Sequence, residues 1–189
     1  MDLQEHLSDF GNALVASAAA LVILAWLGSR LGWVASLAFL ICFLGVIGAV
    51  VGLKFIAFDL RPPVGETNIL GLSEGAPSGH TAFATIVYGA LAAILVVVDR
   101  RPRAWAAAAL CLAVIAAVAI TRVTLDRHTI GDVVAGLIVA GVGVGAFASA
   151  LQNLARDRSV SAMAPFILVA IVTGALLASG IRFNTLALL

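Results

Sequence analysis

Charged side chains are scarce in this sequence. Only 11% of its 189 residues are charged, whereas 62% are hydrophobic, and the mean hydropathy is +1.14. In soluble domains about a quarter of the residues are charged. A chain with so few polar side chains has too few of them to form a water-exposed surface around its apolar core. The composition therefore excludes an ordinary soluble domain and predicts a protein that is surrounded by lipid.

The sequence also lacks an excess of charge of one sign and a framework of cysteines. Its 11 basic and 10 acidic residues give a net charge of +1, whereas a protein that neutralises nucleic-acid phosphates needs a marked basic excess. Cys42 and Cys111 each lie in a long apolar run, where a thiol behaves as a small hydrophobic group. We therefore expect no nucleic-acid partner and no disulfide framework.

Long uncharged segments occupy most of the chain. Six of them approach or exceed the roughly 20 residues that a helix needs to cross a bilayer. They run Phe10–Ser29, Leu31–Leu53, Thr81–Val98, Ala104–Thr121, Val133–Ala155 and Ser159–Ile181. The acidic segment before the first one is unlike a signal peptide, so we expect that span to stay in the mature protein. The sequence predicts an all-α polytopic membrane protein, one domain over residues 1–189 with about six transmembrane helices.

Two connections are longer and more polar than the others. Residues 54–80 contain Pro62, Pro63 and Pro77, and residues 122–132 contain several charged side chains. With six spans, both connections lie on the same side of the membrane. Non-helical backbone near a bilayer is tolerated where it is buried in protein or lines a wet cavity. These two segments are therefore the predicted location of an active site at one membrane face.

Basic residues set the predicted orientation. The connections opposite the long ones contain Arg30, Arg100, Arg101, Arg103, Arg156 and Arg158, whereas the other side contains Lys54, Arg61, Arg122, Arg127 and Arg182. Eight of the ten acidic residues also lie on that other side. Because basic residues favour the cytoplasmic side, we expect the long connections to face the periplasm or the outside of a bacterial-type inner or plasma membrane. Trp26, Trp33 and Trp105 are expected to form an aromatic belt at the inner interface.

The first candidate group consists of Lys54 and Arg61. They are seven residues apart, close to two helical turns, so both cations would project from one face of a helix that continues past the second span. Pro62 and Pro63 end that helix. The alternative is a pair of interfacial cations whose side chains reach lipid headgroups.

The second candidate group is Pro77-Ser78-Gly79-His80, directly before the third span. Ser78 can cap the helix, and Gly79 lets backbone N–H groups approach an anion at the positive end of the helix dipole. A serine followed by glycine is common at any helix start. The distinguishing residue is His80, because an imidazole can donate a proton to a leaving oxygen near neutral pH.

The third candidate group is Arg122, His128 and Asp132. The last two are four residues apart at the start of the fifth span, so they share one helical face, and the carboxylate can bond one ring nitrogen while the other stays available. A neutral imidazole held in this way can act as a nucleophile. The alternative is an ordinary surface pair of histidine and aspartate. The sequence contains no further cluster with metal-ligand spacing, so we expect no metal or other cofactor.

The order and spacing of these groups resemble the three-part signature of the type-2 phosphatidic acid phosphatase superfamily. The matching parts are Lys54-x6-Arg61-Pro62, Pro77-Ser78-Gly79-His80 and Arg122-x5-His128-x3-Asp132, and the motif-bearing core covers about residues 54–136. The family includes undecaprenyl-diphosphate phosphatases, phosphatidylglycerophosphate phosphatases, bacterial acid phosphatases and vanadium haloperoxidases. Two departures are visible. The third part usually begins Ser-Arg and here reads Thr121-Arg122, and many of the lipid phosphatases have three spans before the first part, where this chain has two.

The resemblance implies a role for each residue. His128 would be the nucleophile that forms a phosphohistidine, Asp132 its orienting partner, and His80 the acid for the leaving group and then the base for water. The phosphate oxygens would be held by Lys54, Arg61, Ser78, the Gly79 amide and Arg122. The family's mechanism requires no metal.

The sequence thus predicts an integral membrane phosphatase that hydrolyses the phosphomonoester or diphosphate of a membrane lipid. Because the site is expected to face outward, we favour an isoprenoid diphosphate as the substrate over phosphatidate, phosphatidylglycerophosphate and lipid A. One alternative is a phosphotransferase that passes the phosphoryl group from the same phosphohistidine to another acceptor. The other is an anion transporter or channel whose pathway is lined by charged residues. The connection 64–76, with Ile69, Leu70 and Leu72, is predicted either to lie beside the lipid chain or to be a plain surface loop.

Overall fold

The computed structural model describes residues 3–56, 66–68, 71–73, 75–99, 101–156 and 160–179. Within these ranges all regular structure is helical, which confirms the all-α prediction. The elements are α1 (Leu3–Asp9), α2 (Ala13–Arg30), α3 (Trp33–Ile56), α4 (Gly79–Ile94), the π-helical turn η2 (Leu95–Asp99), α5 (Pro102–Thr124), α6 (Ile130–Leu154) and α7 (Met163–Ala178).

Five membrane-length helices account for most of the described chain. They are α2, α3, α4 together with η2, α5 and α6, each long and apolar enough to cross a bilayer, and α7 is a shorter apolar helix of 16 residues. The chain is therefore embedded in a membrane. The sixth expected span, Ser159–Ile181, extends at both ends into residues outside the described ranges.

Within the first uncharged run, Phe10–Ser29, the helix begins at Ala13, where we expect its apolar core to start. The side chain of Asn12 accepts a hydrogen bond from the Leu14 backbone N–H (2.9 Å) and caps α2. The residues before this cap form the separate helix α1 and a turn. The other spans begin and end within a few residues of the expected positions.

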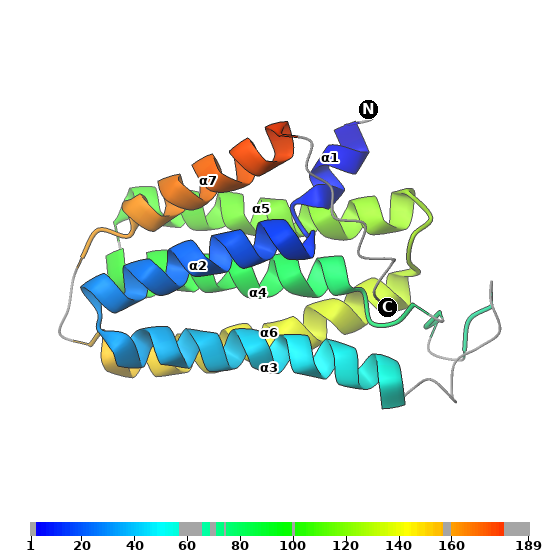
Figure 1. Ribbon diagram of the computed structural model, residues 1–189, viewed down its shortest axis with the longest axis horizontal. Coiled ribbons are helices and arrows are strands. Elements are labelled where there is room, and N and C mark those ends of the chain that lie inside the picture. The colour runs from blue at the N-terminus through cyan, green and yellow to red at the C-terminus, as the bar shows by residue number, and fades with distance from the viewer. Residues whose placement is uncertain are drawn as a thin grey trace.

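Helix α4 is the centre of the bundle. It packs against α2, α3, α5 and α6, and Figure 1 shows it enclosed by these helices. Within the part of the chain that the structure describes, 78% of its apolar window is buried, against 22–39% in the other four spans. The outer helices expose large apolar side chains, as expected for lipid-facing surfaces.

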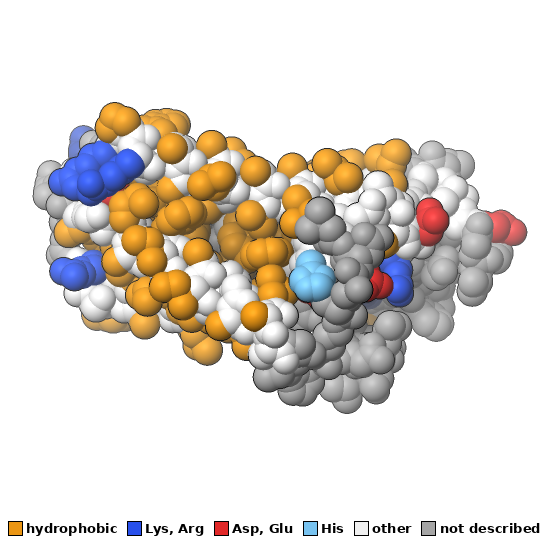
Figure 2. Space-filling view, turned by 90° about the horizontal axis from the view of Figure 1, so that it is seen from above, with side chains coloured by type: hydrophobic (Ala, Val, Ile, Leu, Met, Phe, Trp, Pro, Cys, Tyr) orange, Lys and Arg blue, Asp and Glu red, His pale blue; other side chains and the backbone are white. Residues whose placement is uncertain are grey.

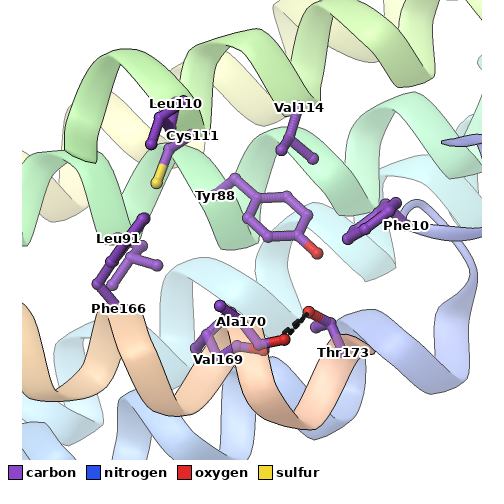
Figure 3. Close-up of a pocket in the computed structure, with 10 residues that line it drawn as sticks. All are labelled: Phe10, Tyr88, Leu91, Leu110, Cys111, Val114, Phe166, Val169, Ala170 and Thr173. Carbon is purple, nitrogen blue, oxygen red and sulfur yellow. Dashed lines mark hydrogen bonds between the residues drawn. The ribbon is translucent and has the colours of Figure 1, made fainter. Parts of the chain in front are cut away.

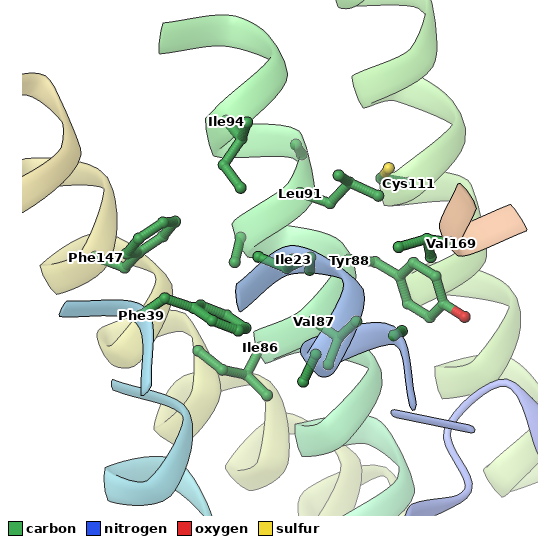
Figure 4. Close-up of a cluster of buried hydrophobic side chains, with 14 of the residues drawn as sticks. Ile23, Phe39, Ile86, Val87, Tyr88, Leu91, Ile94, Cys111, Phe147 and Val169 are labelled. Carbon is green, nitrogen blue, oxygen red and sulfur yellow. The ribbon is translucent and has the colours of Figure 1, made fainter. Parts of the chain in front are cut away.

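The core places aromatic and branched side chains around α4, as Figure 4 shows. Phe39 on α3 and Phe147 on α6 are fully buried and meet edge to face, with ring centroids 5.4 Å apart. Near the end of α4 that begins at Gly79, helix α6 approaches very closely at Gly136. A methyl group on residue 136 would lie 2.7 Å from the Ser78 carbonyl oxygen, so this glycine allows the two helix starts to meet.

The two long connections lie at the same end of the bundle, as predicted, with α1 beside them (Figure 1). The opposite end contains the connections with Arg30, Arg101 and Arg103. Figure 2 shows Lys and Arg side chains at the left end of the face, apolar side chains over its middle, and histidine, acidic and further basic side chains toward the right. Trp33 and Trp105 are exposed at the end that contains Arg30. Trp26 is only 7% exposed and packs in the core, so its predicted place in an aromatic belt was wrong.

Candidate active site

One end of the bundle brings most of the predicted site residues together. His80 begins α4, Arg122 ends α5, His128 precedes α6 and Asp132 lies in its first turn. The charges of Lys54, at the end of α3, and of Arg122 act on both histidine rings, and the charge of His128 also acts on His80. Arg61, the remaining predicted cation, lies outside the described residues.

His128 and Asp132 form the predicted pair. Nδ1 of His128 lies 3.3 Å from Oδ2 of Asp132, and the side chains are 11% and 0% exposed. The buried carboxylate orients the ring and favours a proton on Nδ1, which leaves the Nε2 lone pair available for reaction. This arrangement suits a nucleophilic imidazole.

The same carboxylate caps α6. The Thr129 backbone N–H donates to Oδ2 of Asp132 (3.0 Å), and the Asp132 backbone N–H donates to the Thr129 hydroxyl (3.2 Å). These reciprocal bonds form a capping box. Thr129 was not identified from the sequence, although the Thr-x-x-Asp pattern before an apolar run is a signal for it.

Ser73, in the connection between α3 and α4, supplies two further donors to Asp132. Its backbone N–H donates to Oδ1 (2.8 Å) and its hydroxyl to Oδ2 (2.5 Å). The Thr129 hydroxyl donates in turn to the Gly71 carbonyl oxygen (2.6 Å), and Gly71 adopts the left-handed backbone region with φ of 69°. The sequence contains no signal for this attachment, because it joins residues 59 positions apart.

Gly75 covers one edge of the His128 ring. A methyl group on residue 75 would lie 3.2 Å from Cε1 and 3.3 Å from Nδ1 of that ring. The Gly75 backbone N–H donates to the Ser73 hydroxyl (3.1 Å). At residue 75 the connection therefore lies against the edge of the imidazole that carries Cε1 and Nδ1.

The start of α4 differs in one respect from the prediction. Ser78 is the N-cap residue, but its side chain makes no capping hydrogen bond. The buried hydroxyl instead accepts from the Thr81 hydroxyl (3.1 Å), and the Ser78 backbone N–H donates to the Asp132 carbonyl (3.0 Å). At Gly79, an added methyl group would meet no neighbouring element within 4 Å among the described residues, so the described part of the chain leaves room beside the positive end of this helix.

Arg122 is held by a residue that sequence reasoning did not select. Its Nη1 donates to the Ser8 hydroxyl in α1 (2.9 Å), whereas its buried Nε has no hydrogen-bond partner among the described residues. Arg127 is a further cation at this end of the bundle, and it was not predicted for the site. Its charge acts on both Arg122 and His80. The backbone N–H groups of Arg127 and His128 both donate to the Arg122 carbonyl at 3.1 Å, which folds this connection over the end of α5.

The surroundings of His128 favour its neutral form. Burial and the charge of Arg122 lower the pKa of His128 below its ordinary value, and the hydrogen bond that Asp132 accepts from the ring offsets only part of this effect. A neutral imidazole is the nucleophilic form. Within the described ranges, no group of three or more His, Cys, Asp or Glu residues could hold a metal ion, and the positive charge at this end of the bundle comes from side chains.

A separate cavity lies between α4, α5 and α7, as Figure 3 shows. It has a volume of about 110 Å³, and it is lined by Phe10, Tyr88, Leu91, Leu110, Cys111, Val114, Phe166, Val169, Ala170 and Thr173. Thr173 bonds to its own helix through the Val169 and Ala170 carbonyl oxygens (2.8 and 3.3 Å). This lining is suited to hydrocarbon and carries none of the predicted catalytic groups.

Comparison with known proteins connects this geometry to a family. The model of the PAP2 superfamily matches residues 33–157, which extend from the start of α3 to just beyond α6. No curated protein and no solved structure matches the chain. The matched region covers more than half of the chain and includes His80, His128, Asp132 and the cations around them. The chain therefore belongs to the PAP2 superfamily and is an enzyme of the phosphatase or phosphotransferase type that acts on phosphate esters.

Proposed function

We propose that this protein is a membrane lipid phosphatase that works through a phosphohistidine at His128. The observation that carries the proposal is the contact between Nδ1 of His128 and the buried carboxylate of Asp132 (3.3 Å), with a second histidine, His80, close enough to feel the charge of His128. An imidazole oriented by a carboxylate, with an acid nearby, is a known arrangement for nucleophilic catalysis.

In the first step, the Nε2 lone pair of His128 forms a bond to phosphorus while the bond from phosphorus to the leaving oxygen breaks. Protonated His80 gives its proton to that oxygen. Asp132 stabilises the positive charge that develops on the His128 ring. Lys54, Arg122 and the Gly79 N–H stabilise the charge on the phosphoryl oxygens, with Arg61 as the further cation expected from the sequence.

In the second step, neutral His80 takes a proton from a water molecule whose oxygen bonds to phosphorus. The bond between phosphorus and Nε2 breaks, and its electron pair returns to His128. Inorganic phosphate leaves, and both histidines regain their starting protonation. Phosphoryl transfer of this kind depends mainly on positioning and charge stabilisation, which the side-chain cations supply without a metal.

A lipid is the proposed substrate because the site lies at the end of membrane-spanning helices. The chain is embedded in a membrane, and α3, α5 and α6 expose large apolar side chains. A phosphate group on a membrane lipid would therefore be presented at the level of His80 and His128. An isoprenoid diphosphate, phosphatidate or phosphatidylglycerophosphate fits this description, with the site facing the periplasm or the outside.

The buried Nε of Arg122, which has no hydrogen-bond partner among the described residues, adds support for a phosphate ligand. A buried N–H without an acceptor is costly, and a phosphate oxygen is the strong, charged acceptor that a guanidinium binds best. Membership of the PAP2 superfamily favours an enzyme over the transporter or channel alternative, because PAP2 enzymes act on phosphate esters.

The deciding experiment is phosphate release by the purified protein in detergent with EDTA present. Phosphatidate, undecaprenyl diphosphate and a water-soluble phosphomonoester are compared, with His128→Ala as the blank. We expect release from at least one lipid and none from the variant. Release that the variant retains in full would overturn the mechanism, and phosphohistidine without release would indicate transfer to another acceptor.

A further inference from the structure

The N-terminal segment contacts the active site from outside the family region. Helix α1 packs against α5, and Figure 1 shows it at the same end of the bundle as the two long connections. The family match begins at residue 33, so nothing in the three-part signature assigns a role to residues of α1. Two contacts connect this segment to predicted catalytic and phosphate-binding residues.

The first contact joins Ser8 to Arg122. The Ser8 hydroxyl accepts a hydrogen bond from Nη1 of Arg122 at 2.9 Å, and Ser8 is only 4% exposed. An arginine side chain has many rotamers, and a buried acceptor on one guanidinium nitrogen selects among them. Because Nη1 is held in this way, the other nitrogens of the guanidinium have a fixed direction in which to meet a phosphate oxygen.

The second contact joins Gly11 to His80. A methyl group on residue 11 would lie 2.5 Å from the His80 carbonyl oxygen and 2.9 Å from Cγ1 of Val118. The backbone at residue 11 therefore rests directly on the first turn of α4. A side chain at this position would displace either the N-terminal turn or the backbone that carries the His80 imidazole.

We propose that the segment Ser8–Gly11 positions the phosphate-binding and acid residues of the site, with Ser8 fixing Arg122 and Gly11 fixing His80. This proposal rests on the proposed function. Neither Ser8 nor Gly11 touches the reacting atoms, so both act as positioning residues. The catalytic unit of this protein thus extends beyond the family region to the N-terminal helix.

For Ser8, the values of KM and kcat distinguish a loss of Arg122 positioning from a loss of folded protein. In Ser8→Ala, Arg122 loses a charge-assisted hydrogen bond, so we expect KM to rise about tenfold with kcat within about twofold. A purely structural defect would instead reduce the amount of active enzyme and lower kcat at unchanged KM. Ser8→Thr keeps the hydroxyl and should restore most of the affinity. Gln4→Ala, on the same helix at an exposed contact with Thr124, is the matched control and should resemble wild type.

The test for Gly11 uses a matched pair of glycines. Gly11→Ala should lower kcat at least about tenfold, because the displaced His80 no longer meets the leaving oxygen. Gly45→Ala introduces the same methyl group on α3, where no described atom lies within 4 Å, and should retain wild-type kcat. A Gly11→Ala protein with the kcat of Gly45→Ala would overturn the second half of the proposal.

The position of the Arg122 guanidinium can also be measured without any enzymatic reaction. The guanidinium N–H signals of Arg122 can be followed by NMR in detergent, with Arg122→Lys for assignment. They should shift in Ser8→Ala and remain in place in Gln4→Ala, whichever substrate the enzyme uses. A wild-type protein inactive on every phosphate ester would refute the proposed function, whereas an active Ser8→Ala protein with unchanged KM and unshifted signals would refute the role of Ser8.

Discussion

The carboxylate of Asp132 accepts hydrogen bonds from both the backbone N–H and the hydroxyl of Ser73, which lies 59 positions earlier in the chain. The same carboxylate meets Nδ1 of His128. A segment between the first two motifs therefore helps to hold the orienting partner of the proposed nucleophile. Donors that hold a carboxylate in this way restrict its position relative to the residue that reacts.

Removing the Ser73 hydroxyl should slow the reaction without abolishing it. Ser73→Ala deletes one of the donors to Asp132, and the backbone N–H of residue 73 still holds the other oxygen. We expect kcat to fall roughly tenfold, in line with the loss of one hydrogen bond to a charged group. Steady-state phosphate release gives the value. Ser149→Ala, at an exposed hydroxyl on α6, is the control, and equal rates for the two variants would contradict the role of Ser73.

Substitution of the proposed nucleophile should reduce activity more than substitution of its orienting partner. His128→Ala should abolish turnover, and Asp132→Asn should lower kcat at least about 100-fold, because the ring loses both its orientation and the charge that stabilises it. Wild type quenched during turnover should carry acid-labile phosphate on His128. The label must be absent from His128→Ala, while circular dichroism shows the helical content of wild type. Labelled phosphate that remains in this variant would place the covalent step elsewhere.

The acid limb of the pH profile should report His128. Burial and the charge of Arg122 lower the pKa of His128, so the neutral nucleophile persists to a pH below the ordinary histidine value of about 6.5. Activity is therefore lost only when the pH falls through this lowered pKa. Arg122→Gln removes a positive charge and should move the limb to higher pH. The measurement is kcat/KM against pH, and an acid limb that moves to lower pH in Arg122→Gln would contradict this assignment.

The close approach of α6 and α4 at Gly136 should contribute to stability. In Gly136→Ala the added methyl group would meet the Ser78 carbonyl at 2.7 Å, and overpacking of this kind costs about 1–3 kcal/mol. Gly141→Ala on the same helix adds a methyl group with no described atom within 4 Å and serves as control. Melting temperatures in detergent should fall for the first variant and stay near wild type for the second. The same melting temperature for both would show that the helices can separate there freely.

Local relationships could be predicted from the sequence with good accuracy. The uncharged runs predicted the membrane-embedded, all-α fold, and the four-residue spacing of His128 and Asp132 predicted a contact that the structure contains. The family suggested by the three motifs is confirmed. These features depend on helix periodicity and on composition, which act between residues close together in the chain.

Some local details were wrong because tertiary contacts compete with local preference. Ser78 occupies the N-cap position, but Thr81 and the buried surroundings take its hydroxyl away from the capping role. Trp26 packs inside the bundle and not on its outer surface, because α2 is close enough to its neighbours to enclose the side chain. In both cases contacts with neighbouring side chains outweigh the usual preference of the residue type for a helix cap or for a membrane interface.

The sequence by itself determined that this is a helical membrane protein of a phosphate-ester family, with two histidines, an aspartate and several cations at one end. Tertiary structure alone decided which groups hold them there. Ser73 meets Asp132 across 59 positions, and Ser8 meets Arg122 across 114. Such partners depend on how the helices pack, and a lone serine in a connection or a short helix has no pattern that reveals its neighbour.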